Sequence, residues 1–163
     1  MTAALVRVAL TAVACAIAVP ASAQTLARKD LSIDGAVALA TAAMADCKGK
    51  GWPVSVTVVG RNGEVIAQLR GDGTGPHTTE NSFKKAFTSR TFRIPSGEME
   101  ERLKKNPQMG AQYLTGFTTG RGALPIKIGE ETIAAAGASG APGGEKDEAC
   151  VQAGIDKVKA QLN

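Results

Sequence analysis

The chain has 163 residues, of which 44% are hydrophobic and 21% are charged. This length suits one domain and is too short for two hydrophobic cores of ordinary size. The 19 Lys and Arg against 15 Asp and Glu give a net charge of +4 with both signs interspersed, a mild balance that argues against a nucleic-acid-binding protein.

Residues 1–23 have the layout of a secretory signal peptide. Arg7 precedes an apolar run over residues 8–19, and the small-residue site Ala21-Ser22-Ala23 follows. An apolar run of about a dozen residues is shorter than the roughly 20 needed to span a bilayer. We therefore predict cleavage after residue 23, a periplasmic or secreted location without membrane insertion, and a single mature domain over residues 24–163.

The first part of the predicted mature chain indicates a helix, a hairpin and a loop. The Ala-rich segment 31–45 has apolar residues at helical spacing, with Ser32 as its N-cap. Two β-rich runs, 54–59 and 64–69, flank an Asn-Gly pair and predict a β-hairpin. The segment Gly71-Asp72-Gly73-Thr74-Gly75-Pro76 cannot continue a strand, so it is expected to form a loop.

Beyond the loop, the pattern predicts two helices, an irregular or short helical lid, a second hairpin and a final helix, over residues 78–92, 96–105, 108–120, 123–138 and 145–162. Thr78 and Ser96 are the expected N-caps. The alanine run before Gly137 is equally helix-like by propensity. We favour a strand because Gly129 closes the preceding strand and Gly137 would weaken a helix. Paired hairpins with four helices predict an α+β domain built on an antiparallel sheet.

Two cysteines, Cys47 and Cys150, remain in the predicted mature chain. An exported compartment permits a disulfide between them, which would close nearly the whole domain and stabilise it by roughly 4 kcal/mol in chain-entropy terms. Two buried free thiols are the alternative. The sequence leaves both open, because bridging requires the two Cα atoms to lie close together.

Four short segments occur in an order and at spacings that are typical of one protein family. They are Gly51-Trp52-Pro53-Val54-Ser55-Val56, Lys85-Ala86-Phe87-Thr88, Gly122-Ala123-Leu124-Pro125-Ile126, and Gly137-Ala138-Ser139-Gly140 followed by Glu145-Lys146-Asp147-Glu148. With them, about residues 31–159 resemble the GlcG/HbpS family, which includes the carboxy-terminal domain of PduO-type proteins. The resemblance implies an antiparallel sheet of about five strands, flanking helices, assembly into homo-oligomers, and binding of haem or a related tetrapyrrole, with cobalamin also allowed.

His77, the only histidine, is the candidate metal ligand. It lies where the Gly-rich loop meets a helix, and in the resembling family a histidine in this region is expected to ligate haem iron through its imidazole. Phe83 and Phe87 could offer apolar faces to a macrocycle, and Arg90, Arg93 or Arg121 could pair with its propionates. The alternatives are a solvated loop histidine and phenylalanines that belong to the core.

From these features we predict an exported protein that binds or senses haem, more plausibly a binder than an enzyme. A haem-dependent redox or haem-degrading enzyme, and an accessory protein that binds small organic acids, are the alternatives. No catalytic residue is assigned, because Ser82 and the acids near His77 have no distinguishing context. Lys85 is interpreted as one of several charges on solvated helix faces. The adjacent Asp147 and Glu148 are interpreted as charges in the first turn of the final helix.

Overall fold

The computed structural model describes residues 24–162, so the predicted signal peptide lies outside the described residues. Its helices and strands are α1 (Ile33–Gly49), β1 (Ser55–Val59), β2 (Val65–Arg70), α2 (His77–Phe92), α3 (Glu98–Lys105), the 3₁₀ helix η1 (Gly110–Tyr113), β3 (Ala123–Ile128), β4 (Glu131–Ser139), α4 (Gly144–Val158) and η2 (Lys159–Gln161). None of the helices in this part of the chain is long and apolar enough to cross a membrane.

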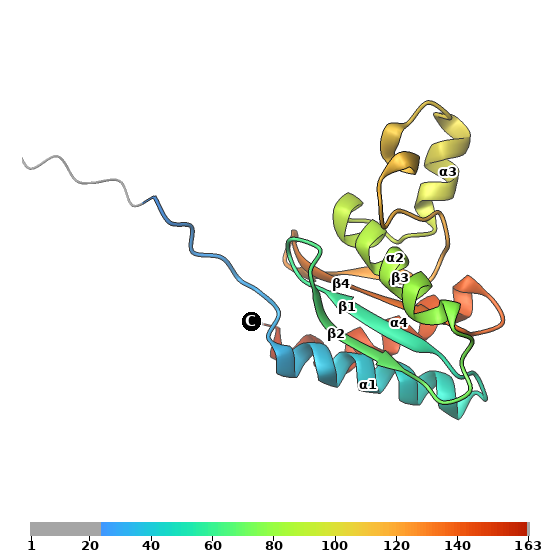
Figure 1. The fold of residues 1–163 in the computed structure, drawn as a ribbon. Coiled ribbons are helices and arrows are strands. Elements are labelled where there is room, and N and C mark those ends of the chain that lie inside the picture. Colours follow the sequence, from blue (N-terminus) through green and yellow to red (C-terminus); the bar gives the residue numbers. More distant parts are fainter. Residues whose placement is uncertain (1–23, 163) are drawn as a thin grey trace, which may run out of the picture.

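The strands form one antiparallel sheet in the order β2-β1-β4-β3. Both predicted hairpins are present, and they join through β1 and β4, where Ser55 lies opposite Ser139 and Val59 opposite Ala135. Helices α1 and α4 cover one face of the sheet and α2 covers the other (Figure 1). Helix α3 stands away from the sheet on a lobe formed by residues 98–122, which also contains η1. The predicted α+β class with an antiparallel sheet is confirmed.

The sheet has four strands among the described residues, rather than the about five that the resemblance implies. The two hairpins supply all four. The long segment between α3 and β3 forms η1 and turns and adds no strand. Its glycines disfavour a strand, because Gly116 has a φ of +85° and glycine has no side chain that could pack in a sheet.

The predicted N-caps at Thr78 and Ser96 are wrong, and both hydroxyls make other hydrogen bonds. Helix α2 starts one residue before Thr78, whose buried hydroxyl donates to the carbonyl of Gly75 at 2.8 Å. Ser96 lies two residues before α3, and its Oγ donates to the Gly120 carbonyl at 2.8 Å and accepts from the Ala123 N–H at 3.1 Å. The Ser96 hydroxyl therefore ties the base of the lobe to the start of β3.

The apolar core lies between the sheet and the pair α1 and α4. Alternate residues of each central strand point to this side, as the period of two along a strand requires. Helix α1 begins after Ser32, whose Oγ accepts from the Gly35 N–H at 3.2 Å, so this predicted N-cap is confirmed. The core residues of the two central strands and α1 are Val56, Val58, Ile133, Ala134, Ala136, Ala138, Ala36, Leu39, Ala40, Ala43 and Cys47.

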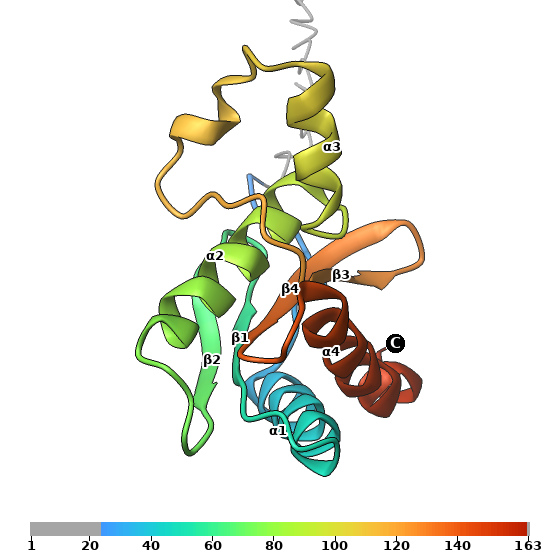
Figure 2. The same ribbon diagram turned by 90° about the vertical axis from the view of Figure 1, so that its right-hand side faces the viewer.

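Cys47 of α1 and Cys150 of α4 form a disulfide in this core, with their Cα atoms 5.5 Å apart. Both residues are fully buried. Figure 2 shows α1 and α4 side by side beneath the sheet, which is what brings the two cysteines together. Of the two states that the sequence leaves open, the structure has the bridge.

Replacing Cys47 and Cys150 by serine should lower the free energy of unfolding by about 4 kcal/mol, since the bridge closes a loop of roughly 100 residues in the unfolded chain. Urea-induced unfolding of the wild-type and double-variant chains measures the difference. A reducing agent should lower the free energy of unfolding of the wild type to nearly that of the double variant. It should leave the free energy of unfolding of the double variant unchanged. Equal unfolding midpoints for both chains would show that the bridge adds no stability.

Candidate ligand-binding site

Helix α2 contacts the sheet through a small and polar surface. Ser55 Oγ lies 2.7 Å from Thr78 Oγ1, and Thr57 Oγ1 lies 2.8 Å from Ser82 Oγ, with all four residues buried. The pairing satisfies hydroxyls that would otherwise lose their hydrogen bonds to water. A Cβ at Gly137 of β4 would lie 2.5 Å from the Ser82 carbonyl oxygen, so glycine allows α2 to approach this closely.

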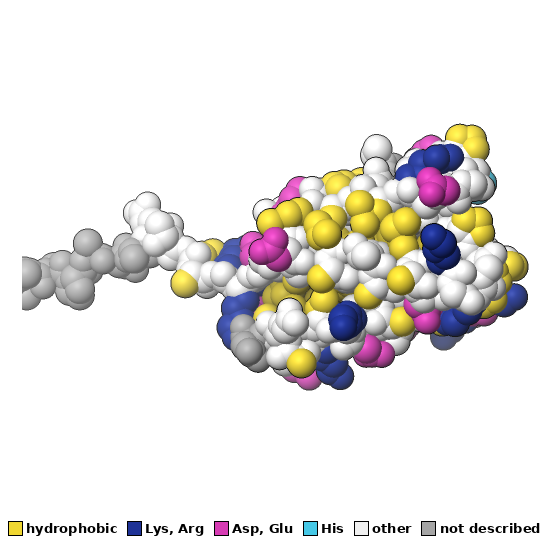
Figure 3. Space-filling model, turned by 90° about the horizontal axis from the view of Figure 1, so that it is seen from below, with side chains coloured by type: hydrophobic (Ala, Val, Ile, Leu, Met, Phe, Trp, Pro, Cys, Tyr) yellow, Lys and Arg dark blue, Asp and Glu magenta, His cyan; other side chains and the backbone are white. Residues whose placement is uncertain are grey.

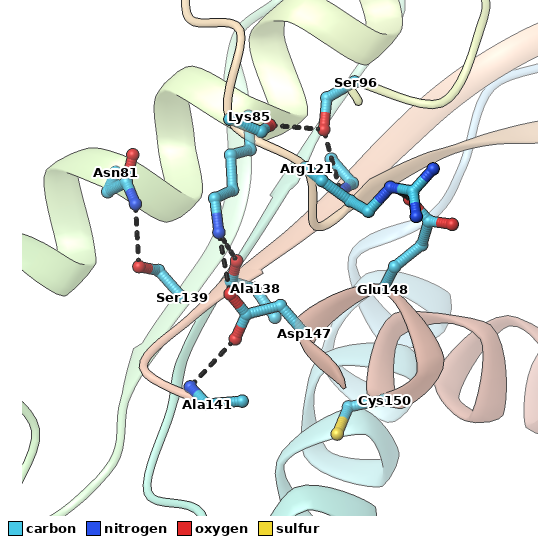
Figure 4. Close-up of polar contacts among 12 residues, drawn as sticks. Asn81, Lys85, Ser96, Arg121, Ala138, Ser139, Ala141, Asp147, Glu148 and Cys150 are labelled. Atoms are coloured by element: carbon cyan, nitrogen blue, oxygen red, sulfur yellow. Dashed lines mark hydrogen bonds and ion pairs between the residues drawn. The ribbon is translucent and has the colours of Figure 1, made fainter. Parts of the chain in front are cut away.

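Lys85 and Asp147 form a buried ion pair between α2 and α4. Lys85 Nζ lies 2.7 Å from Asp147 Oδ2 and donates to the Ala138 carbonyl at 3.0 Å, and Asp147 Oδ1 accepts from the Ala141 N–H at 3.0 Å (Figure 4). Only 5% and 4% of the two side chains is exposed. The interpretation of Lys85 as part of a solvated helix face is wrong, because the folded chain places it beside a partner 62 residues away. Asp147 does lie in the first turn of α4, as predicted, but its carboxylate is buried.

Two acidic groups at the start of α4 have perturbed ionisation. Burial raises the pKa of Asp147 above its ordinary value, and this outweighs the opposing effects of Lys85 and the Ala141 N–H. Burial also raises the pKa of Glu148, although Arg121 opposes the shift from 3.8 Å away. Both carboxylates are therefore easier to protonate than exposed ones.

A polar hollow of about 360 Å³ opens between the start of α2 and the end of β4. His77, Asn81 and Lys85 line it from α2, four residues apart and so on one stripe of the helix. Asn81 Nδ2 donates to Ser139 Oγ at 2.9 Å on the opposite wall. His77 is exposed, and its ring lies over Gly75, where a Cβ would come within 2.8 Å of the imidazole.

Sequence reasoning missed Asn81, Lys85, Ser139 and Asp147 as lining residues. The four-residue spacing from His77 to Asn81 and Lys85 was available as a signal, because residues so spaced share a helix face. Nothing local could indicate Ser139 or Asp147, which come from β4 and α4.

The predicted aromatic residues lie in the middle and the second half of α2, away from His77. Phe83 and Phe87 have ring centroids 5.7 Å apart, and Phe87 lies against Gly63 of the β1–β2 turn and Gly116 of the lobe. Phe87 is ten residues beyond His77, or roughly 15 Å along the helix axis. The structure therefore does not bring these rings to the hollow.

The predicted arginines also lie apart from the hollow. Arg90 Nε is buried and has no hydrogen-bond partner among the described residues, and its pKa is lowered by burial and by the neighbouring charges of Arg61 and Arg93. Arg121 lies near Glu148 at the start of α4 (Figure 4). Within residues 24–162, no three His, Cys, Asp or Glu side chains gather as a metal cluster.

These observations define a small α+β domain whose four-stranded sheet is covered on both faces and carries a polar hollow at one end. The chain belongs to the HbpS-like family, because the family model described as "Haem degrading protein HbpS-like" matches residues 31–156. The resemblance to the GlcG/HbpS group is thereby confirmed. No curated protein matches the chain significantly in sequence.

Solved structures agree with the family assignment. A crystal structure of HbpS is 33% identical, with a TM-score of 0.78 over 85% of this chain and 97% of that one. A double mutant of Streptomyces reticuli HbpS is also 33% identical, with a TM-score of 0.75 over 84% and 97% of the two chains. The PduOC–haem complex, at 20% identity and a TM-score of 0.72 over 79% and 95%, shares the fold.

Replacing Lys85 by methionine should lower the free energy of unfolding by about 3–5 kcal/mol near neutral pH, because Asp147 stays buried without its cation. The loss of Lys85 raises the pKa of Asp147 further. Protonation then removes the unpaired charge, so the difference from wild type should narrow as the pH falls to about 5. Urea unfolding at both pH values measures this narrowing.

Two variants serve as controls for this prediction. Lys84→Met removes the neighbouring, exposed lysine, whose pairing with Glu80 is a surface contact, and should cost at most about 1 kcal/mol. Adding Asp147→Asn to Lys85→Met should recover part of the loss, since no buried charge then remains. A cost for Lys85→Met that is equal at both pH values would contradict the burial of an unpaired carboxylate.

Proposed function

We propose that this protein binds haem and that the His77 imidazole ligates the haem iron. Membership of the HbpS-like family and the fold shared with PduOC, whose structure is a haem complex, support haem-related binding. The observation that carries the proposed site is the exposure of the chain's only histidine beside a polar hollow. Imidazole is a common axial ligand of haem iron.

The exposed imidazole of His77 has the donor chemistry of a haem-iron ligand, and the loop that precedes it is ordered. When bound, haem supplies an iron to which an imidazole nitrogen can coordinate. The loop before His77 is fixed by its own hydrogen bonds: Arg70 Nη2 donates to the Thr74 carbonyl at 2.6 Å, and Thr74 Oγ1 donates to the Gly71 carbonyl at 2.8 Å. These bonds limit the positions open to the imidazole. Phe83 has no place in this proposal, because it packs on the sheet.

Haemin titrated into the full chain should give a shifted Soret band that His77→Ala abolishes or moves, because the variant removes the proposed iron ligand. Absorption spectroscopy at micromolar haemin measures this directly. Glu80→Gln is the matched control, since Glu80 is exposed in the same first turn of α2 and should leave the spectrum unchanged. A Soret band that is identical in wild type and His77→Ala would rule out His77 as the ligand.

Haem degradation is a second candidate function, and the description of the family model favours it. It requires an open face of the iron and access for a second reactant. The haemin-loaded wild type separates the two functions. Loss of the Soret band under peroxide, faster than for free haemin, supports degradation, and a stable band supports binding alone.

We further propose that the protein is exported and assembles into homo-oligomers. The Cys47–Cys150 disulfide supports export, because such bridges persist in oxidising compartments. Exposed large apolar side chains support assembly, among them Ile33 and Val37 of α1 and Val65 of β2. Figure 3 shows hydrophobic side chains gathered on the face seen from below, where α1 lies.

Export predicts a defined amino terminus for the mature protein. Expressed with its full sequence in a bacterium, the protein should appear outside the cytoplasm and begin at Gln24, since the signal is expected to end at residue 23. Intact-mass measurement of the purified protein checks the cleavage position. A full-length mass for protein recovered from the cytoplasm would contradict export.

A further inference from the structure

A second hollow, of about 410 Å³, lies next to the polar one and has a different character. Met44, Trp52, Pro53 and Val54 form its apolar wall, from the end of α1 and the segment before β1. Pro53 also lines the polar hollow, but His77 does not reach this second one. Its volume lies within the range of small-molecule pockets, about 300–1,000 Å³.

The end of β2 closes this hollow through a tight approach. A Cβ at Gly71 would lie 2.6 Å from the Val54 carbonyl oxygen and 3.5 Å from the Met44 Cε, so only glycine lets the chain pass here. The Met44 thioether and the Trp52 indole are side chains that contact aromatic rings favourably. The wall therefore suits a flat, apolar ring system.

The rim of the hollow is mainly cationic. Lys48 from the last turn of α1 and Arg70 from the end of β2 line it, against the single carboxylate of Asp72. Outside the lining, the ammonium groups of Lys50, which pairs with Asp46, and of Lys146 lie over the Trp52 ring at 5.8 and 5.2 Å from its centroid. An apolar wall beside such a rim is complementary to a molecule that carries a ring at one end and a negative charge at the other.

We propose that this hollow binds a planar aromatic carboxylate. Its ring lies against Trp52 and Met44, and its carboxylate accepts hydrogen bonds from Lys48 and Arg70. The site is separate from the haem site proposed at His77. Whether this site binds an aromatic carboxylate does not depend on whether His77 binds haem.

The single tryptophan of the chain makes the proposal directly testable. In ¹⁵N-labelled protein, Trp52 gives one indole N–H signal, which should shift in proportion to occupancy when 2-naphthoate is added. The neutral 2-naphthamide has the same ring without the charge and should bind roughly tenfold more weakly, because charge-assisted hydrogen bonds are lost. Calorimetry on the same samples gives the two dissociation constants.

Lys48→Glu should weaken 2-naphthoate binding by roughly tenfold or more, since it places a like charge at the rim. Lys105→Glu is the matched control, because it makes the same change in the last turn of α3 and should leave the affinity unchanged. Overturning results are an unshifted Trp52 signal at millimolar 2-naphthoate, equal affinity for 2-naphthamide, or equal weakening by both variants. The haemin spectrum, read separately, reports on His77 and is not expected to change in Lys48→Glu.

Discussion

The ion pair between Lys85 and Asp147 joins parts of the fold that otherwise have little contact. Lys85 belongs to α2 on one face of the sheet and Asp147 to α4 on the other, and they meet at the end of β4 beside Ala138. Removing two charges from water is costly, and the pair is tolerated because their hydrogen bonds to Ala138 and Ala141 compensate for lost solvation. The pair thereby connects the middle of α2 to the start of α4, and Lys85 also lines the hollow that His77 borders.

Small side chains also hold α2 close to the sheet. With Gly137 in β4 and the hydroxyl pairs from Ser55 and Thr57 in β1, the first half of α2 approaches the sheet through small and polar side chains. Because α2 runs alongside β1, its two ends become chemically distinct. His77 lies at the polar end with Asp147, whereas Phe87 packs at the opposite end against the β1–β2 turn.

The loop from Gly71 to Pro76 gives one end of the molecule two different hollows. Its first residues, with Arg70 and Trp52, line the apolar one, and its later residues, with His77, line the polar one. Proximity of an apolar wall and a polar, imidazole-bearing wall is a common feature of sites for amphipathic ligands. The same short loop therefore contributes to both proposed binding sites.

The sequence by itself determined the two hairpins, the antiparallel α+β layout, the N-cap at Ser32 and the position of His77 at a loop–helix junction. All of these depend on residues close together in the chain, whose periodicity and turn chemistry are local properties. Only the tertiary structure decided that Cys47 bridges Cys150, that Lys85 is buried, and that Phe87 packs against Gly63 and Gly116. Those outcomes depend on contacts between distant segments, and a local pattern does not reveal which distant residue a side chain will meet.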